Sequence, residues 1–359
     1  MQSLCNPFLK NYHKEPEAGL VMYLEIDGGY GEGGGQMVRS GLALSCITGR
    51  PVRIFNIRKN RRIPGLGAQH VTTARILQKM SGARVEGAEK GSTEIRFAPG
   101  DVTDLETSEE IGTAGSISLV LQVAILAAAA SKRRLKCTIS GGTDVPWSPT
   151  INYTRYVLGA AYARMGMHFS VDVHRRGYYP KGGGSATLSV NPSSLRPASF
   201  SKRDSNVRLV CTYSKMQADE IEAQVGRIQD ELSGGGVTVD SEIRRQDAAD
   251  PGASLLAYGA GKDSVIGADA LFDKKMRSFD LDTDCLVCSP GVDANLADML
   301  VVPASLCGAK TTFRIREITR HLETNLYVAS KITGCRYGIG KIDDGFEVIV
   351  EGVSHAGIK

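Results

Sequence analysis

The chain of 359 residues repeats one pattern, and this repeat restricts the possible folds more than any other feature. At three places a segment with helical periodicity ends in a glycine and a strand-like run follows at once: QKMSGARVEG, YARMGMHFSV and SKITGCRYGI. The glycines are Gly82, Gly166 and Gly334, so the intervals are 84 and then 168 residues, twice the first. A fixed interval of this kind indicates a chain built from repeated structural units.

Each unit is predicted to contain a helix, a strand, a second helix that ends at the glycine, and two further strands. In the first unit the first helix starts near Gly35, the strand is PVRIFNI and the second helix is AQHVTTARILQKMS. The corresponding helices are SISLVLQVAILAAAA and PTINYTRYVLGAAYARM in the second unit, and NLADMLVVPASLC and HLETNLYVASKI in the third. We expect Ser148 to cap the helix that begins with Pro149.

The doubled interval leaves room for one further segment between the second and third units. Residues 201–280 fill it, with strand-like runs RLVCTYS, GVTVDSEIRR and SLLAYGA, a helix in MQADEIEAQVGRIQDELSG and a last helix near ADALFDKKM. We interpret this segment as an inserted α+β domain, although ELSGGGVTVD also fits a divergent fourth unit. Residues 21–200 plus 281–359 would then form the catalytic repeat domain, and residues 1–20 an N-terminal extension.

Composition excludes some classes of function. A formal charge of +4 permits a nucleic-acid partner, but the few aromatic residues, with Trp147 as the single tryptophan, argue against an extended base-stacking surface. The chain has no apolar run of about 18 residues, so no membrane span or membrane partner is expected. The eight cysteines are irregularly spaced, which favours a reduced protein in the cytoplasm. For the pair Cys285 and Cys288 we favour packing in a strand over a zinc site, because no second ligand pair accompanies it.

The stretch DGGYGEGGGQMVRS, residues 27–40, places a glycine-rich loop between a short strand and a helix. Free backbone N–H groups at such a helix start suit an anion. Gln36 and Arg39 share one face of the first turn, where Arg39 can form a forked pair with a phosphate. Glu32 would repel that phosphate unless a cation lay between them, which suggests Mg²⁺. The spacing matches neither the Walker nor the dinucleotide motif, and a tight corner with a surface glutamate is the simpler interpretation.

Two further clusters carry positive charge. In NIRKNRRIPGLGAQH, residues 56–70, four cations occupy five positions between a strand and a helix. A solvated basic loop is one interpretation, but its place at the same end of the unit as the glycine-rich loop favours an RNA backbone or a polyphosphate. RRGYYPKGGG, residues 175–184, adds further cations, and we expect one of Tyr178 and Tyr179 to pack. We hypothesise a basic strip that guides an RNA end, made of Arg175, Arg176, Lys181 and the cluster from Arg58 to Arg62.

His321 stands at the start of the helix in RHLETN. The partial positive charge of a helix N-terminus disfavours protonation, so this imidazole should stay neutral and nucleophilic. The other histidines, among them His70, are expected to be packed or capping residues.

Seven segments occur in one order: DGGYGEGGGQMVRSGLALS, IRKNRRIPGLGAQH, GTAGSISLVLQ, SGGTDVPWSP, RRGYYPKGGG, NLADML and RHLETN. Together they resemble the RNA 3′-terminal phosphate cyclase family from about residue 22 to 352. The resemblance implies an α/β (α+β) fold of repeated β-α-β-α-β-β units, shared with enolpyruvyl transferases, with a small inserted α+β domain. It also implies an ATP-dependent enzyme that uses a divalent metal, Mg²⁺ or Mn²⁺.

The reaction implied by the resemblance converts an RNA 3′-phosphate into a 2′,3′-cyclic phosphate in three steps. A histidine takes AMP from ATP and releases pyrophosphate, and the AMP then passes to the RNA 3′-phosphate. The neighbouring 2′-hydroxyl finally attacks that phosphate and expels AMP. RNA with a 3′-phosphate end is therefore the expected partner, and DNA is not expected as the main substrate.

Residue roles carry over by motif. The resemblance assigns the nucleophile to His321 and the metal-associated glutamate to Glu32. It assigns phosphate binding to Arg39, Arg58 and Arg61, with Gln69 beside them. The expected nucleotide-binding residues are Glu32, Gln36, Gln122, Asn295 and Asp298.

Some positions depart from the family pattern. Met299 stands where many members have glutamine, and Asn295 where an aromatic residue often occurs. Trp147 and Thr150 lie in a loop that is usually richer in small residues and proline. These departures touch the expected nucleobase pocket and leave the phosphate chemistry unchanged, so they bear on the preference for ATP.

Two rival functions share these features. A non-catalytic branch of the family acts in ribosome assembly, but the presence of His321 with the arginines favours the enzyme. An enolpyruvyl transferase has the same architecture and needs no covalent histidine. Nothing in the sequence specifies an oligomeric state.

Overall fold

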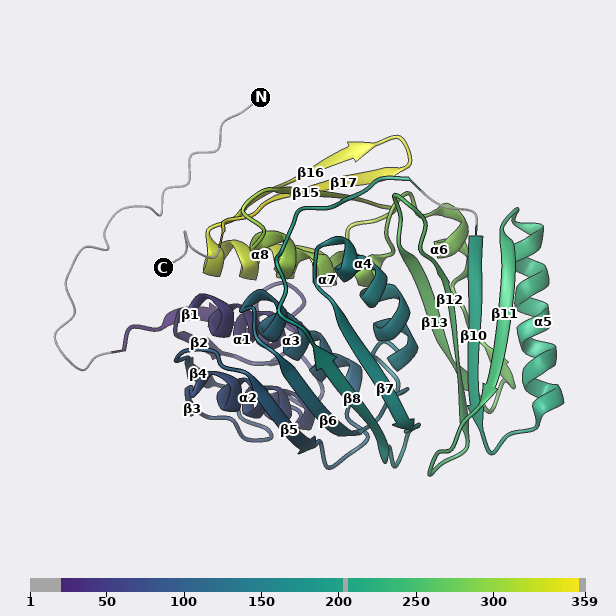
Figure 1. The fold of residues 1–359 in the computed structure, drawn as a ribbon, viewed down its shortest axis with the longest axis horizontal. Coiled ribbons are helices and arrows are strands. Elements are labelled where there is room, and N and C mark those ends of the chain that lie inside the picture. Colours follow the sequence, from purple (N-terminus) through teal and green to yellow (C-terminus); the bar gives the residue numbers. More distant parts are fainter. Residues whose placement is uncertain (1–20, 203–205, 355–359) are drawn as a thin grey trace.

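The computed structural model describes residues 21–202 and 206–354. These residues form four β-sheets, three with four strands and one with five, and helices lie between them (Figure 1). The N-terminal extension predicted for residues 1–20 lies outside the described residues.

The first repeat unit has the order β-α-β-α-β-β. The first two strands, β1 and β2, pair in parallel. The last strand, β4, pairs antiparallel with β2 on one side and with β3 on the other, which gives the sheet order β1-β2-β4-β3. The elements are β1 (Leu24–Asp27), α1 (Gln36–Thr48), β2 (Val52–Phe55), α2 (Ala68–Ser81), β3 (Arg84–Glu86) and β4 (Ile95–Ala98).

The second unit repeats this order, and its sheet runs β5-β6-β8-β7. Its second helix opens with a π-helical stretch, η1, that continues as α4. The elements are β5 (Leu105–Glu110), α3 (Ile117–Ala130), β6 (Leu135–Gly141), η1 (Tyr153–Leu158), α4 (Gly159–Arg164), β7 (Phe169–Arg175) and β8 (Gly184–Val190).

The third unit is interrupted after its first strand. That strand, β9, precedes the inserted segment and pairs in parallel with β15 beyond it, so the sheet order is β9-β15-β17-β16. The repeated fold predicted from the sequence is therefore confirmed. The elements are β9 (Ser199–Phe200), α7 (Ala294–Ser305), β15 (Lys310–Ile315), α8 (Arg320–Thr333), β16 (Arg336–Ile342) and β17 (Gly345–Glu351).

The inserted segment is not built like a repeat unit. Its sheet order is β11-β10-β12-β13-β14, and a separate apolar core runs from Val207 to Leu286. The boundaries at residues 201 and 280 stay a prediction. The elements are β10 (Asn206–Ser214), α5 (Ala218–Gly234), β11 (Thr238–Arg245), β12 (Gly252–Gly259), β13 (Ile266–Asp273), β14 (Ser278–Phe279) and α6 (Thr283–Cys288).

Two local predictions, one for the inserted segment and one just beyond residue 280, are wrong. The run ADALFDKKM is strand β13 and a turn, not a helix, because antiparallel pairing with β12 overrides the helix preference of its alanines. Cys285 and Cys288 lie in the short helix α6 instead of a strand.

The predicted start of the second unit's second helix is also wrong. Thr150 caps this helix, since its Oγ1 accepts a hydrogen bond from the backbone N–H of Tyr153 at 3.2 Å. Pro149 precedes the helix, and the Ser148 hydroxyl donates to the carbonyl of Val145 at 3.0 Å. The loop before this helix is therefore two residues longer than the sequence suggested.

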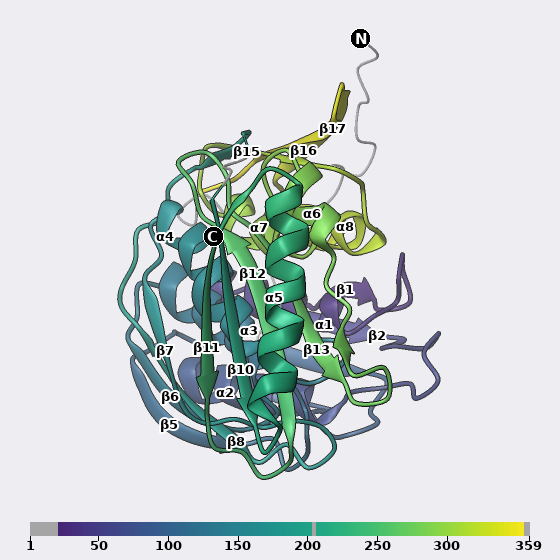
Figure 2. The same ribbon diagram turned by 90° about the vertical axis from the view of Figure 1, so that its right-hand side faces the viewer.

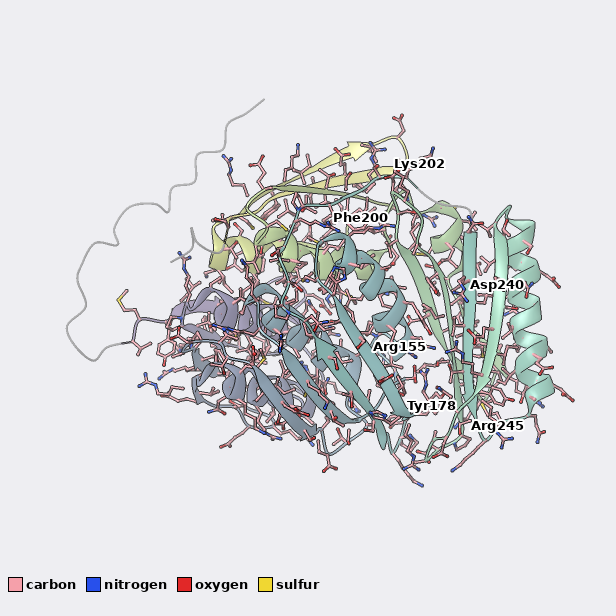
Figure 3. The ribbon with its side chains drawn as sticks, viewed as in Figure 1. Arg155, Tyr178, Phe200, Lys202, Asp240 and Arg245 are labelled. Atoms are coloured by element: carbon pink, nitrogen blue, oxygen red, sulfur yellow. The ribbon has the colours of Figure 1, made fainter. Side chains whose placement is uncertain are left out.

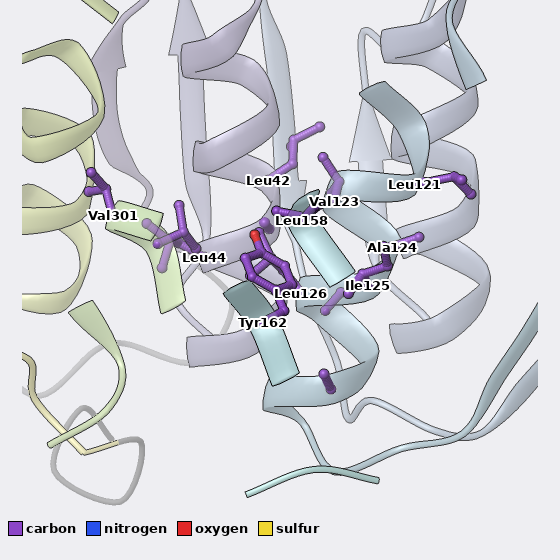
Figure 4. Close-up of a cluster of buried hydrophobic side chains, with 14 of the residues drawn as sticks. Leu42, Leu44, Leu121, Val123, Ala124, Ile125, Leu126, Leu158, Tyr162 and Val301 are labelled. Carbon is purple, nitrogen blue, oxygen red and sulfur yellow. The ribbon is translucent and has the colours of Figure 1, made fainter. Parts of the chain in front are cut away.

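Helices of all three units form the centre of the repeat domain (Figure 4). Helix α3 is apolar on every side and buried along almost its whole length, as expected for a central helix. Leu42 and Leu44 of α1, Leu126 of α3, Tyr162 of α4 and Val301 of α7 belong to one cluster. The sheets lie around the helices, and α5 covers the outer face of the inserted sheet (Figure 2).

Buried polar groups join the second unit to the inserted segment. Arg176 is only 1 % exposed; it pairs with Asp144 at 3.0 Å, and its Nε donates to the side-chain oxygen of Gln246 in the inserted segment at 2.6 Å. Tyr178 is buried at the same junction (Figure 3), where its hydroxyl donates to the carbonyl of Thr212 at 3.1 Å. Tyr179 is exposed. The inclusion of Arg176 in a basic strip is therefore wrong, because this guanidinium has a structural partner and does not reach the surface.

Candidate active site

A cavity of about 840 Å³ lies where helix starts from all three repeat units meet. The N-terminus of a helix carries partial positive charge and free N–H groups, so several of them around one cavity favour an anionic ligand. Each of these helix starts contributes a residue to the cavity wall: Gln36 of α1, Gln69 of α2, Ser116 at the start of α3, Asn295 of α7 and His321 of α8.

The structure brings the predicted site residues together. Two of them, Gln122 and Asp298, line a smaller adjoining cavity of about 20 Å³, whose wall also contains Gln36 and Arg39. Their chemical roles stay predictions. The predicted residues in the wall of the large cavity are Glu32, Gln36, Arg39, Arg58, Arg61, Gln69, Asn295 and His321.

His321 and Glu32 form a close pair. The imidazole Nδ1 lies 2.7 Å from Oε2 of Glu32, and the other carboxylate oxygen pairs with Arg61. Burial lowers the pKa of His321; the Asp298 carboxylate opposes this shift, and the positive charge of Arg39 adds to it. In the neutral imidazole Nδ1–H donates to Glu32, so the lone pair stays on Nε2.

The glycine-rich loop packs tightly against two neighbouring elements. Gly31 has a φ of +62°, and a Cβ there would overlap the hydroxyl of Thr324 in α8. A Cβ on Gly35 would overlap the ring of His70 in α2. Side chains larger than hydrogen would therefore push the loop away from both helices, and the loop could not carry Glu32 to His321.

Arg39 is held in an unusual environment. Its Nη2 donates to the side-chain oxygen of Gln36, and its Nε is buried without a hydrogen-bond partner in the described part of the chain. Burial lowers the pKa of Arg39 to about 10, against the opposing influence of Asp298. A cationic donor left unsatisfied beside a cavity has spare capacity for an anionic ligand.

Asp298 interacts electrostatically with this arginine. Burial raises the pKa of its carboxyl to about 7. Its Oδ1 accepts a hydrogen bond from Thr319, the residue that caps α8 one position before Arg320. Asp298 thus contacts the start of the helix that carries His321.

His70 is a cavity residue that the sequence did not reveal. It is packed and capping, as expected, because its Nδ1 accepts from the backbone N–H of Gly67 at 2.9 Å. Burial lowers the pKa of His70 to about 3, so the ring is neutral and Nε2 carries the hydrogen. That Nε2 is buried and unpartnered in the described residues, and the ring lines the cavity.

The cavity wall also contains groups from outside the predicted site residues. Pro146, Trp147 and Ser148 come from the loop after β6, and Asp269 comes from β13 of the inserted segment. Asp269 accepts a hydrogen bond from the backbone N–H of Thr150 at 2.6 Å. The inserted segment therefore contributes to the cavity wall, and no motif in the sequence predicted this contribution.

The side chains of the cavity suit a divalent cation only when a bound substrate supplies further ligands to the cation. Among residues 21–202 and 206–354 no three His, Cys, Asp or Glu side chains are grouped to hold a metal ion. Mg²⁺ is usually held by one or two carboxylates plus substrate phosphates, and Glu32 beside the arginines fits that use. In the same residues no helix is long and apolar enough to cross a membrane.

Comparison with known proteins identifies the family of this chain. A protein named RNA 3′-terminal phosphate cyclase from Methanococcoides burtonii is 35% identical over 331 residues, 91% of this chain and 100% of that protein. The one from Archaeoglobus fulgidus is 35% identical over 87% of this chain and 96% of its own length. The one from Pyrococcus furiosus is 36% identical over 86% of this chain and 93% of its own length.

A solved structure of EPSP synthase from Acinetobacter baumannii aligns with 88% of this chain and 62% of its own, at 12% identity and a TM-score of 0.27, which is too low to support an argument. The family model described as RNA 3′-terminal phosphate cyclase matches residues 30–339. With a match over most of the chain and relatives above 30% identity along nearly their full length, the chain belongs to the RNA 3′-terminal phosphate cyclase family.

Proposed function

We propose that the protein converts an RNA 3′-terminal phosphate into a 2′,3′-cyclic phosphate at the expense of ATP. The observation that carries this proposal is the placement of His321, oriented by Glu32, in a cavity with Arg39, Arg58 and Arg61 in its wall. A nucleophile beside several cations suits transfer of a nucleotide between phosphates.

In the first step Nε2 of His321 attacks the α-phosphorus of ATP. A P–N bond forms, the bond to the β-phosphate oxygen breaks, and pyrophosphate leaves. This step needs a neutral imidazole, which the lowered pKa of His321 provides. Glu32 holds the ring through Nδ1–H and stabilises the positive charge that develops on it.

In the second step an oxygen of the RNA 3′-phosphate attacks the AMP phosphorus, and the P–N bond breaks. In the third step the 2′-hydroxyl oxygen bonds to the 3′-phosphorus, its proton passes to water, and AMP leaves. The arginines bind the phosphate oxygens on which negative charge accumulates. Loss of one such cation should cost about 3 to 4 kcal/mol of transition-state stabilisation, by analogy with the loss of a single oxyanion donor.

A divalent cation, Mg²⁺ or Mn²⁺, would supply further neutralisation of phosphate charge, with Glu32 as its protein ligand. The remaining parts of the proposal are an RNA substrate in preference to DNA and a place of action in the cytoplasm. The latter rests on free, buried thiols such as Cys46, Cys137 and Cys211, because free thiols are typical of a reducing compartment.

The test is cyclisation of an RNA labelled in its 3′-terminal phosphate, measured as resistance of the label to phosphatase. With ATP and Mg²⁺ the protein should make the label resistant, and His321→Ala should not. His174→Ala is the matched control, because that imidazole is exposed and bonds Thr187 away from the cavity. RNA binding without any resistant label would favour the alternative, a cyclase-like assembly factor.

A further inference from the structure

The glycine-rich loop runs along helix α8 and contacts it at three successive points. The contacting pairs are Glu32 with His321, Gly31 with Thr324, and Tyr30 with Tyr327. The α8 members are three residues apart, so they lie on neighbouring turns along one side of the helix. From His321 to Tyr327 the helix rises by about 9 Å. The loop therefore leads from a pair in the cavity wall to a pair of tyrosines beyond it.

The two tyrosines at the end of this row are stacked and partly exposed. Their ring centroids lie 4.0 Å apart, and the ring planes differ by 24°. Tyr30 is 49% exposed, and neither Tyr30 nor Tyr327 lines the large cavity. Burial would stabilise a stack that only held the loop on α8, because stabilisation grows with the apolar area removed from water. The exposed part of Tyr30 is instead available to a ligand.

A third tyrosine belongs to the same surface. Tyr337 of β16 is 45% exposed. Burial of part of its side chain raises the pKa of Tyr337, and the nearby Tyr30 adds to this shift, so the two side chains are neighbours. Single exposed apolar residues need no explanation, but a group of them indicates a binding surface. We call Tyr30, Tyr327 and Tyr337 the tyrosine patch.

Two lysines flank the tyrosine patch. Lys331 lies one turn beyond Tyr327 on α8, with its Nζ 5.6 Å from the centre of the Tyr327 ring and 3.3 Å from its hydroxyl oxygen. Lys59 lies against the loop, because a Cβ on Gly29 would be 3.2 Å from its Cδ. Both lysines are exposed. Their ammonium groups can bind phosphates while the rings beside them stack on bases.

The same area contains two carboxylates. A hydrogen bond from the N–H of Gly29 lowers the pKa of Asp27, and the nearby Lys59 and Lys331 lower it further. Glu323, on the same helix as Lys331, lies close to the tyrosine patch. Positive and negative charges are thus nearly balanced around the patch, so stacking contributes more to ligand binding there than charge does.

A ligand that continues from the cavity fits this arrangement. In the proposed function only the end of the RNA lies beside His321, so the preceding nucleotides must leave the cavity across its surroundings. The tyrosine patch joins the cavity through the loop that carries Glu32. Flat rings bind the faces of unpaired bases without regard to sequence. These observations favour the RNA chain over a protein partner as the occupant of the patch.

We propose that the tyrosine patch binds the nucleotides directly before the 3′-terminal one by stacking on their bases. The inference rests on the proposed function for the position of the RNA end. Three tyrosines suffice for a few bases and form no extended stacking surface. The patch therefore selects RNA with an unpaired 3′ end and accepts any sequence there. Loss of one stacked base changes affinity by about ten-fold or more.

The test is binding of a 5′-fluorescein RNA with a 3′-phosphate end, measured by anisotropy without ATP. Tyr30→Leu keeps an apolar side chain against α8 but removes the flat ring, so Kd should rise about ten-fold, and Tyr30→Phe should restore most of the affinity. Tyr179→Leu is the matched control and should leave Kd unchanged, because this tyrosine is 62% exposed and lies outside the cavity wall. Pairing the last nucleotides with a complementary strand should weaken binding to the wild type by a similar factor.

Self-adenylation separates the binding of RNA from a structural role of Tyr30. If labelling by α-labelled ATP without RNA fell in Tyr30→Leu as strongly as RNA binding, the ring would act by holding the loop that carries Glu32, and the inference would be overturned. It is also overturned if Tyr30→Leu leaves Kd within two-fold, or if Tyr179→Leu weakens binding as much.

A photochemical cross-link tests the same contact without a substitution. 5-Iodouridine is placed at the second or third position from the 3′-phosphate end of the RNA, or near its 5′ end, and the cross-linked peptides of the wild type are identified. Cross-links from the second or third position should lie on the tyrosine patch, and cross-links elsewhere would contradict the inference. A cross-link on the patch in a protein that does not cyclise RNA would contradict the proposed function and leave the inference intact.

Discussion

Nδ1 of His321 lies 2.7 Å from Oε2 of Glu32, and this contact joins the third repeat unit to the glycine-rich loop of the first. The two residues are almost 290 positions apart in the chain, and only the packing of α8 against that loop brings them together. The two carboxylate oxygens of Glu32 therefore pair with two side chains, His321 and Arg61.

The first prediction concerns the orientation of His321. Glu32→Gln keeps an oxygen that can accept from Nδ1–H, whereas Glu32→Ala removes it. Self-adenylation with α-labelled ATP should fall about 10-fold in the first variant and about 100-fold in the second, by analogy with carboxylates that orient metal-binding imidazoles. Equal losses in the two variants, both restored by high Mg²⁺, would mean that Glu32 acts only as a metal ligand.

The second prediction concerns the buried charge of Arg39. Arg39→Met removes a poorly solvated guanidinium, so the free energy of unfolding should rise by about 1 to 3 kcal/mol. Self-adenylation of the same variant should fall by at least 100-fold. Urea unfolding and the labelling assay measure the two effects, and a variant that is less stable and still active would contradict this account of Arg39.

The third prediction concerns the close approach at Gly31. Gly31→Ala should destabilise the protein by about 1 to 2 kcal/mol, because its φ is positive and the new methyl group meets Thr324. In the double variant with Thr324→Ala the overlap with the Thr324 side chain is removed. Only the destabilisation that comes from the positive φ at residue 31 then remains. Urea unfolding of both single variants and the double variant measures this coupling. If the changes in the free energy of unfolding of the two single variants add up to that of the double variant, there is no steric contact between the loop and α8 at this point.

The fourth prediction concerns pH. The pKa of Asp298 is raised to about 7, so the native state keeps a proton that the unfolded chain has already lost above about pH 4. Stability should therefore fall as pH rises through the interval from about 4 to 7 and level off above it. Between pH 5 and 8 the wild type should lose about 2 to 3 kcal/mol relative to Asp298→Asn, which lacks this ionisation. The raised pKa of Asp298 would be contradicted if the free energy of unfolding, measured with urea, changed with pH in the same way for both proteins.

The sequence predicted those parts of the fold that depend on local pattern. The glycines that end helices, such as Gly82 and Gly334, adopt the left-handed conformation. Because glycine is favoured at such positions, these helix ends can be recognised from the sequence. Helix periodicity located α1, α2, α3, α7 and α8 within one or two residues. The motifs also led to residues that the structure gathers in one place.

The errors arose where distant segments decide the outcome. Strand β13 forms because β12 pairs with it, and Arg176 is buried because Asp144 and the inserted segment enclose it. The contact of Glu32 with His321 and the contribution of Asp269 to the cavity likewise depend on packing between units. A pattern read along the chain contains no information about such partners.

The central claim is that His321 forms a covalent bond to AMP. The protein and His321→Ala are incubated with α-labelled ATP and Mg²⁺ in the absence of RNA, denatured, and treated with acid or alkali. The account predicts label on the unmodified protein alone, lost in acid and kept in alkali, as expected for a phosphoramidate. Equal labelling of both proteins, or a complete absence of label on a folded protein that cyclises RNA, would contradict it.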